Sequence, residues 1–246
     1  MRLFGLLGYP LTHSFSQKYF TDKFRELGLT NNAQYENFSL PHISALREII
    51  DHKKGLEGFN ITIPYKKAVM KFLDDATSTV KELGACNCVK INNGKLKGYN
   101  TDVVGFEQTL APFLKPQHQK ALVLGTGGAS AAVEWVLRKR NIAYKSVSRT
   151  ASENNIDYAS IDKDLMESHT LVINTTPLGM YPKIDTFPHL PYQFIGVQHH
   201  LFDLVYNPEE TLFLSKGKAQ GASIQNGWEM LILQAEESWR IWNETI

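Results

Sequence analysis

A glycine-rich turn between an apolar run and a helical pattern constrains the fold of this chain most strongly. The turn occupies residues 125–130, follows the apolar residues 121–124 and leads into a helical pattern over residues 129–140. A short apolar run that ends in glycine and leads into a helix is typical of a buried strand in a parallel sheet. The chain is therefore expected to fold as α/β, with helices that cross over between parallel strands.

Short apolar runs and amphipathic helical patterns alternate along the rest of the chain as well. Strands are predicted at residues 3–7, 34–39, 58–62, 87–91, 96–99, 121–124, 144–147, 170–174 and 200–205. Helices are predicted at residues 16–27, 43–51, 64–72, 102–113, 129–140 and 228–242. Asn93-Gly94 lies between two of these strands and accepts positive φ readily, so an antiparallel hairpin is expected there.

Two domains are expected, because a fresh strand–turn–helix unit begins after Pro112 and Pro116. The first would comprise residues 1–101 plus the C-terminal residues 228–246. The second would comprise residues 102–227 and contain the glycine-rich turn. A cleft between the two domains is the expected place for a ligand.

Composition excludes several classes of function. The 246 residues carry 26 basic and 25 acidic side chains, and this balance gives no attraction to nucleic acid or to a membrane surface. The apolar runs are too short for a membrane span, and the N-terminal one is too short for a signal peptide. Cys86 and Cys88 are too few for a disulfide framework, so a reducing cytoplasm is expected. Further ligands for a metal are not close in sequence, so no metal is expected.

The glycine-rich turn has the context that a dinucleotide fingerprint requires. Gly125 permits the tight turn, and Gly127 lets backbone N–H groups approach a pyrophosphate. Gly128 and Ala129 open the helix, whose N-terminus favours negative charge, and Ser130 is small enough for close helix–strand packing. The simpler alternative is that the glycines serve turn geometry alone.

The end of the next predicted strand indicates which nicotinamide would bind. An NAD site usually places Asp or Glu there, whereas this chain has Ser148-Arg149-Thr150. A guanidinium flanked by hydroxyls suits a 2′-phosphate, so NADP is expected. Glu153 adds repulsion nearby, and the alternative is a solvated arginine in a loop.

Two strand-to-helix turns in the first domain carry groups suited to proton transfer. Lys66 lies in a predicted helix with Pro64 in its first turn, and the positive helix end and Lys67 both disfavour the ammonium form. At the second turn Thr101 can cap a helix whose dipole favours the carboxylate of Asp102. Carboxyl ends of parallel strands share one edge of a sheet, so the two groups are expected to meet. Each alone is read more simply as a surface charge.

Six motifs resemble those of shikimate dehydrogenases, and they follow the family's order over nearly the whole chain. They are Ser14-Phe15-Ser16, Asn60-Ile61-Thr62-Ile63-Pro64-Tyr65-Lys66, Gly98-Tyr99-Asn100-Thr101-Asp102, Asn174-Thr175-Thr176-Pro177-Leu178-Gly179-Met180, Asp203-Leu204-Val205-Tyr206-Asn207-Pro208 and the segment 227–235. The chain departs from the family at Ser148, where Asn is usual, at Cys86 and Cys88, and in an abbreviated segment 151–173. The first and last of these departures bear on cofactor preference.

The resemblance implies a reaction and a role for each matched residue. The reaction would be the reversible, NADP-dependent reduction of 3-dehydroshikimate to shikimate in aromatic amino acid biosynthesis, with Lys66 and Asp102 as the catalytic pair. Substrate contacts would come from Ser14, Ser16, Thr62, Asn87, Tyr206 and Gln234. Cofactor contacts beyond the turn and the arginine would come from Asn174, Thr175, Met180 and Gly227. The implied protein is a monomer or a homodimer with a small-molecule substrate.

Alternatives accompany these assignments. Ser14 and Ser16 could cap the first helix, and Gln234 could be an exposed helical residue. If Cys86 and Cys88 lie on a strand, they share one face and Asn87 points to the other. Rival functions are a quinate/shikimate dehydrogenase that prefers NAD, and a non-catalytic metabolite sensor on the same fold. A sensor would be expected to have lost Lys66 or Asp102, and both are present.

Overall fold

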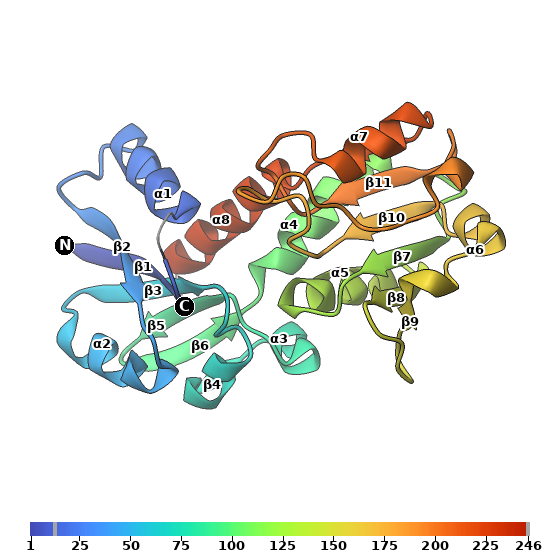
Figure 1. Ribbon diagram of the computed structural model, residues 1–246. Helices are drawn as coiled ribbons and strands as arrows, with labels where there is room; N and C mark the ends of the chain where they lie inside the picture. The colour runs from blue at the N-terminus through green and yellow to red at the C-terminus, as the bar shows by residue number, and fades with distance from the viewer. Residues whose placement is uncertain (12–13, 245–246) are drawn as a thin grey trace. The chain divides into compact units, whose positions relative to one another are not determined.

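The chain forms two compact units, each built on its own six-stranded sheet (Figure 1). The computed structural model describes residues 1–11 and 14–244. Unit 1 comprises Met1–Thr101 and the C-terminal segment from Ala235, and unit 2 comprises Asp102–Gln234. The predicted class, two α/β domains, is confirmed.

The sheet of unit 1 is mixed and has the strand order β2-β1-β3-β5-β6-β4. Its strands are β1 (Arg2–Gly8), β2 (Ala33–Ser39), β3 (Leu56–Ile61), β4 (Asp75–Ala76), β5 (Cys88–Asn92) and β6 (Lys95–Tyr99). Its short helices are α1 (Phe15–Glu26), α2 (Leu46–His52), α3 (Ser78–Leu83) and the 3₁₀ turns η1 (Ile43–Ala45) and η2 (Ala68–Phe72). β1, β2 and β3 are parallel, and β5 and β6 form the predicted hairpin, with positive φ at Asn93 and Gly94.

Alternating side chains of β1 bury both faces of this sheet, as strand geometry requires. Leu3 and Leu7 belong to a core with residues of α2 and α3, whereas Phe4 and Leu6 belong to a core with residues of α1 and the C-terminal helix. Aromatic rings fill the second core: Phe4 stacks on Trp242 with ring centroids 4.7 Å apart. Burying such a ring contributes roughly 2 kcal/mol, so this core anchors the C-terminal helix to unit 1.

The helix predicted over residues 64–72 is wrong. A turn occupies residues 63–67, and only Ala68–Phe72 winds, as the 3₁₀ turn η2. Tertiary hydrogen bonds replace the helical ones, since the Lys66 carbonyl accepts from the Cys86 N–H at 2.8 Å and the Tyr65 hydroxyl donates to the Leu40 carbonyl at 2.5 Å. Lys66 is therefore not placed by a helix terminus, and the dipole argument made for it does not apply.

Cys86 and Cys88 do not share a face. β5 begins at Cys88, so Cys86 lies in the irregular segment before the strand. Cys86 belongs to the core beneath α2 and α3, and Cys88 to the core beneath α1. The expectation that both point to one side rested on a strand that starts too early.

The sheet of unit 2 is wholly parallel, with the order β9-β8-β7-β10-β11-β12. Its strands are β7 (Lys120–Leu124), β8 (Ala143–Ser148), β9 (Ile156–Asp157), β10 (Leu171–Asn174), β11 (His200–Asp203) and β12 (Ser223–Gln225). The remaining helices are α4 (Thr101–Leu110), η3 (Ala111–Phe113), α5 (Gly128–Lys139), η4 (Tyr158–Ser160), α6 (Lys163–Ser168), η5 (Tyr192–Phe194), α7 (Leu212–Ala219) and α8 (Trp228–Asn243). This order is that of a doubly wound dinucleotide-binding sheet. The chain adds β8 and β9 on one side of β7 and then adds β10, β11 and β12 on the other, so the strand order reverses between β7 and β10.

Helices cover both faces of the unit 2 sheet. Residues of α6 and α7, among them Met166 and Phe213, pack against Leu122 and Leu201 in one core. On the other face α4 packs through Phe106, whose ring meets that of Phe202 edge-on with centroids 5.3 Å apart. The connection from β8 to β9 is a turn without a helix, which accounts for the shortness of this segment in the sequence.

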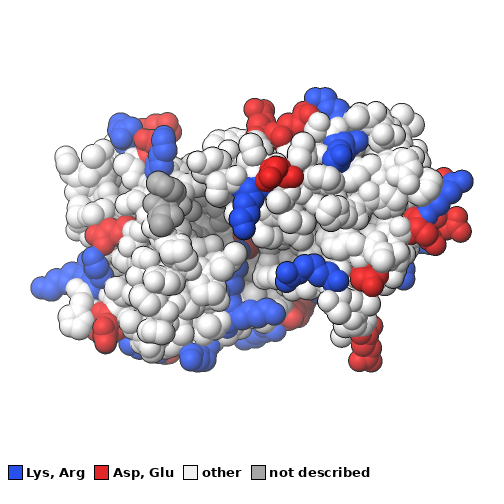
Figure 2. All heavy atoms as spheres, in the orientation of Figure 1, with Lys and Arg blue, Asp and Glu red and all other residues white. Residues whose placement is uncertain are grey.

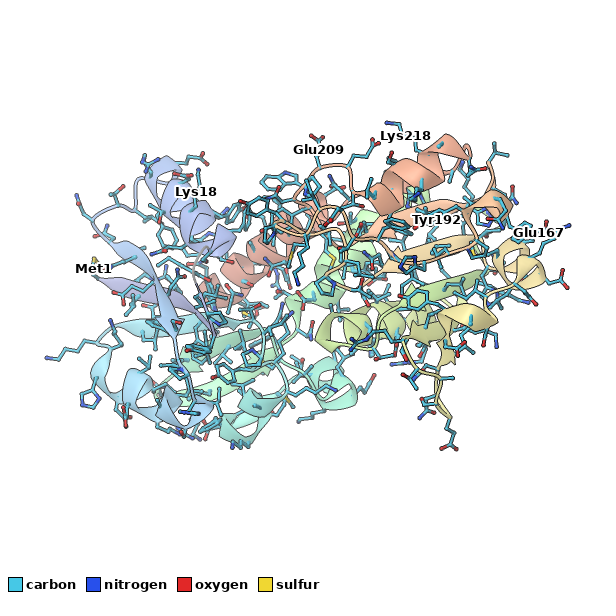
Figure 3. All side chains as sticks on the ribbon, viewed as in Figure 1. Met1, Lys18, Glu167, Tyr192, Glu209 and Lys218 are labelled. Carbon is cyan, nitrogen blue, oxygen red and sulfur yellow. The ribbon has the colours of Figure 1, made fainter. Side chains whose placement is uncertain are left out.

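The surface carries charges of both signs, interspersed on the face drawn in Figure 2. Exposed ion pairs join neighbouring residues, such as Lys18 with Asp22 on α1 and Lys218 with Glu210 beside α7, and both lysines lie at the periphery in Figure 3. Such pairs contribute little to stability. Within residues 1–11 and 14–244, no helix has the length and apolarity needed to cross a membrane.

The buried imidazole of His200 should make unit 2 sensitive to acid. Burial lowers the pKa of His200 from 6.5 to about 4, and the ring lies 2.9 Å from the Ser223 hydroxyl and stacks on Phe113. Below pH 6.5 the unfolded chain gains a proton that the folded chain does not, so stability is lost as the pH falls from about 6.5 to about 4. Between pH 7 and pH 5 the loss attributable to His200 should be about 2 kcal/mol.

Urea unfolding of the wild type and of His200→Gln at pH 7 and pH 5 measures this loss. The free energy of unfolding should depend less on pH in the variant, and all other titrating groups are common to both proteins. Equal pH dependence in the two proteins would refute the role of His200.

Candidate functional site

Gly125 and Thr175 meet where the strand order of unit 2 reverses. Gly125 follows β7 with φ +107°, and a Cβ there would lie 2.8 Å from the Thr175 Oγ1 and 2.9 Å from the Thr176 Cγ2. Thr175 follows β10 and donates to the Leu124 carbonyl from both its N–H (2.9 Å) and its hydroxyl (2.8 Å). Only glycine fits at 125, and the crevice beside such a reversal is where doubly wound sheets bind nucleotides.

The N-terminus of α5 is open to an anion. Gly127 is its N-cap residue in extended conformation, and no side chain of the described residues caps the helix there. A Cβ at Gly127 would have nothing within 4 Å, so the protein itself does not require glycine at this position. Gly128 and Ala129 begin the helix, and Ser130 donates to the Gly127 carbonyl at 2.7 Å. The first N–H groups of α5 can therefore receive a pyrophosphate, and the absence of a side chain permits its close approach.

The Ser148 side chain stabilises a turn, whereas the two residues that follow it are exposed. The Ser148 hydroxyl lies 3.0 Å from the Asn155 Oδ1 and also contacts the Thr150 carbonyl, which fastens the connection between β8 and β9. Arg149 and Thr150 are exposed on this turn. The turn follows β8, which pairs with β7, the strand that leads into the glycine-rich turn. Glu153 lies on the same turn and is also exposed. The turn presents one guanidinium and one hydroxyl for a phosphate group.

Asn174 is wholly buried and organises the loop after β10. Its Nδ2 donates to the Asp203 Oδ1 at 2.9 Å, and its Oδ1 accepts from the Thr176 N–H at 3.1 Å and from the Thr176 hydroxyl at 2.6 Å. Asp203 also accepts from the Val205 N–H at 3.0 Å and from the Thr211 hydroxyl at 2.6 Å. Burial raises the pKa of Asp203 from 3.8 to about 6. The sequence contained Asp203 within a motif but gave no signal of this role.

The other predicted contacts of unit 2 lie near this loop or on α8. Met180 is 46% exposed at the end of the loop, as a residue that covers a flat ligand can be. Gly227 precedes α8, and a Cβ there would lie 2.2 Å from the Leu204 carbonyl oxygen, so close packing requires glycine. Tyr206 is half-buried, with its ring 6.0 Å from that of Trp228. Gln234 donates to the Leu231 carbonyl at 2.9 Å within α8.

The predicted substrate contacts of unit 1 follow the carboxyl ends of β1 and β3 or precede the start of β5. Ser14 and Ser16 precede and begin α1 after β1, and Thr62 follows the parallel strand β3. Asn87 precedes the antiparallel β5 at the same end of the sheet. The Ser14 hydroxyl accepts from the Gln17 N–H at 3.1 Å and so caps α1, the simpler alternative from the sequence, and it retains a hydrogen to donate.

Asn87, not Thr101, satisfies the start of α4. The Thr101 N–H donates to the Asn87 Oδ1 at 2.6 Å, and the Asn87 Nδ2 donates to the Thr101 Oγ1 at 3.0 Å. Thr101 is the first residue of the helix, and the expectation that its side chain caps α4 is wrong. Asp102 is the second residue of α4 and is 9% exposed.

Lys66 and Asp102 belong to different units. Lys66 is half-buried in the turn after β3 of unit 1, and Asp102 opens unit 2. Their pairing therefore stays a prediction, and so do the substrate roles of Tyr206 and Gln234, which belong to unit 2.

Comparisons with known proteins match the chain from end to end. Residues 6–89 match the family described as shikimate dehydrogenase substrate binding domain. A protein named shikimate dehydrogenase (NADP(+)) from Methanococcus maripaludis is 36% identical, covering 98% of this chain and 91% of the relative. The chain belongs to the shikimate dehydrogenase family.

Other shikimate dehydrogenases extend this match to a second organism and to a solved structure. The enzyme of Caldanaerobacter subterraneus is 34% identical over 98% of this chain and 91% of its own length. The crystal structure of the Thermus thermophilus enzyme, solved with NADP(H) and shikimate, has a TM-score of 0.87 at 30% identity, covering all of this chain and 95% of that one. The family predicted from the six motifs is thus confirmed.

Proposed function

We propose that this chain catalyses the reversible, NADP-dependent reduction of 3-dehydroshikimate to shikimate. The observation that carries the proposal is the match, over 98% of the chain, to relatives named shikimate dehydrogenase (NADP(+)). The uncapped N-terminus of α5 at the reversal of the unit 2 sheet supports the same reaction class, because it fits a dinucleotide pyrophosphate. The chain is proposed to act in the cytoplasm, as a monomer or homodimer.

The proposed division of labour follows the two units. Unit 1 would bind the substrate and unit 2 the cofactor, held by Gly125, Gly127, the start of α5 and Thr175. NADP supplies or accepts the hydride when it is bound. Asn174 would act indirectly, by shaping the loop that ends at Met180.

Lys66 and Asp102 are proposed as the proton-transfer pair. During reduction the Lys66 ammonium would donate a proton to the carbonyl oxygen, which would otherwise carry developing negative charge. Asp102 would orient the amine and stabilise its cationic form. Hydroxyl donors at Ser14 and Ser16 would bind the substrate carboxylate, and Thr62, Asn87, Tyr206 and Gln234 would contact the remainder of the ring.

One spectrophotometric assay tests the function. Purified protein with shikimate and NADP should produce the absorbance band of reduced nicotinamide, and kcat/KM should be higher for NADP than for NAD and for shikimate than for quinate. Turnover with NAD and quinate alone would favour the rival quinate dehydrogenase. No turnover with either pair would contradict the proposed function.

Arg149 is expected to select the phosphorylated cofactor. Replacing it with alanine should lower kcat/KM for NADPH about twentyfold, because a charge-assisted hydrogen bond to the 2′-phosphate is lost. kcat/KM for NADH should stay unchanged, since that cofactor has no 2′-phosphate. Arg138→Ala is the matched control, because Arg138 is an exposed arginine of unit 2 that contacts the Tyr144 hydroxyl. An equal loss with both cofactors would exclude this role for Arg149.

A further inference from the structure

A chain of buried hydrogen bonds runs through unit 1 and ends at Asn87. The Tyr35 hydroxyl donates to the Asn60 Oδ1 at 2.9 Å, and the Asn60 Nδ2 donates to the Ser238 Oγ at 2.8 Å. The Ser238 Oγ lies 3.3 Å from the Thr101 Oγ1, which in turn bonds to Asn87. All five side chains are less than one-tenth exposed, and they come from β2, β3, α8, α4 and the segment before β5. We call these five residues the buried polar chain.

The Asn87 amide has one possible orientation. A backbone N–H can only donate, so the Asn87 atom 2.6 Å from the Thr101 nitrogen must be the oxygen Oδ1. The Nδ2 then gives one hydrogen to the Thr101 Oγ1 at 3.0 Å. Its second hydrogen is what Asn87 can offer to a ligand, and Asn87 is thereby fixed as a hydrogen-bond donor.

Donor counting also orients the Asn60 amide within the buried polar chain. Reversing the Asn60 amide would set its oxygen 3.4 Å from the Asn87 carbonyl oxygen, so Nδ2 must face Ser238. The Ser238 oxygen accepts that hydrogen, and its own hydrogen lies within reach of both the Thr101 Oγ1, at 3.3 Å, and the Cys88 thiol, to which Ser238 also bonds. The Thr101 hydroxyl can then donate to the Asn87 Oδ1 at 3.3 Å. Ser238 is therefore the hydrogen-bonded link between Asn60 and Thr101.

We propose that Ser238 is a positioning residue for the substrate: through Thr101 it holds the Asn87 amide with Nδ2 directed to a hydroxyl of the bound acid. This inference rests on the proposed function. Ser238 is wholly buried on α8, so alanine at this position would remove the only oxygen that the side chain contributes and leave the Asn60 Nδ2 without that acceptor. Thr101 would lose its contact with Ser238, and the Asn87 amide would be held less tightly.

Steady-state kinetics of Ser238→Ala test the proposal. The KM for shikimate should rise about tenfold, and the KM for NADP should change less than about twofold, because the buried polar chain belongs to unit 1 and the predicted cofactor residues belong to unit 2. In an Asn87→Ala background, Ser238→Ala should change the shikimate KM little, because its effect passes through Asn87.

A control on the same helix separates positioning from stability. Trp242→Phe removes the hydrogen bond from the Trp242 Nε1 to the Val89 carbonyl (3.0 Å), which is not a hydrogen bond of the buried polar chain, and keeps an aromatic ring beside Tyr35. Its shikimate KM should stay at the wild-type value even where its melting temperature falls as much as that of Ser238→Ala. If Ser238→Ala does not fold, Ser238→Cys replaces it, since a thiol is a weaker donor and acceptor than a hydroxyl and should raise the shikimate KM about threefold.

The outcomes are distinct. Suppose that the wild type turns over shikimate but Ser238→Ala leaves the shikimate KM unchanged. That result overturns the positioning role and leaves the proposed function standing. So does an equal rise in the shikimate KM when Ser238→Ala is introduced into the wild type and into Asn87→Ala. A rise of equal size in Trp242→Phe also overturns it. No wild-type turnover of shikimate overturns the proposed function, and the inference with it.

Discussion

Replacing Lys66 with methionine should lower kcat by about a thousandfold, the usual contribution of a positioned general acid. Methionine keeps the length and apolar part of the side chain and removes the ammonium donor. The backbone should keep its course, because the Lys66 carbonyl bonds to the Cys86 N–H and neighbouring Tyr65 is anchored by its hydroxyl. Substrate affinity should change little, since the lost interaction belongs to the transition state.

Lys67→Met is the matched control for this variant. Lys67 is the next residue in the same turn, and its side chain is exposed. Stopped-flow and steady-state measurements with shikimate and NADP should give near wild-type kcat for Lys67→Met. A near-normal kcat in Lys66→Met, or an equal loss in both variants, would remove Lys66 from the mechanism.

Replacing Asp203 with alanine should lower the free energy of unfolding by about 4 kcal/mol. Three buried donors lose their acceptor: the Asn174 amide, the Val205 N–H and the Thr211 hydroxyl. Each unpaired donor in the core costs its desolvation energy, and relaxation of the loop reduces the sum. Urea unfolding followed by circular dichroism measures the loss.

Asp203→Asn is the informative companion to the alanine variant. An asparagine keeps one acceptor oxygen, so it should lose about half as much stability. Because Asn174 shapes the loop before Met180, the KM for NADP should rise in both Asp203 variants while the KM for shikimate changes less. A loss below about 1 kcal/mol in Asp203→Ala would show that the three donors find other acceptors.

Local signals explain what could be predicted from the sequence. The glycine turn at 125 is specified by positive φ, and the hairpin at Asn93-Gly94 by the same property, so both appear where the sequence places them. Short apolar runs gave most strands of both sheets. α3 (Ser78–Leu83), α6 (Lys163–Ser168) and α7 (Leu212–Ala219) were not predicted, because elements so short show little periodicity.

Tertiary contacts explain what could not be predicted. The segment around Lys66 has a helical pattern, yet partners at Cys86 and Leu40 satisfy its backbone and side chain in another conformation. Thr101 has the residue type of an N-cap, but a distant amide takes that place. Asp203 bonds to Asn174 and Ser238 to Asn60, each far away in sequence, and a single sequence contains no sign of such contacts.

The placement of Cys86 and Cys88 on opposite faces of one sheet affects the chemical durability of unit 1. Both thiols are fully enclosed, and burial raises the pKa of Cys88, so the reactive thiolate is scarce. Peroxide and alkylating agents reach these sulfur atoms only when the sheet itself opens. Oxidation of these two cysteines is therefore limited by the rate at which unit 1 unfolds.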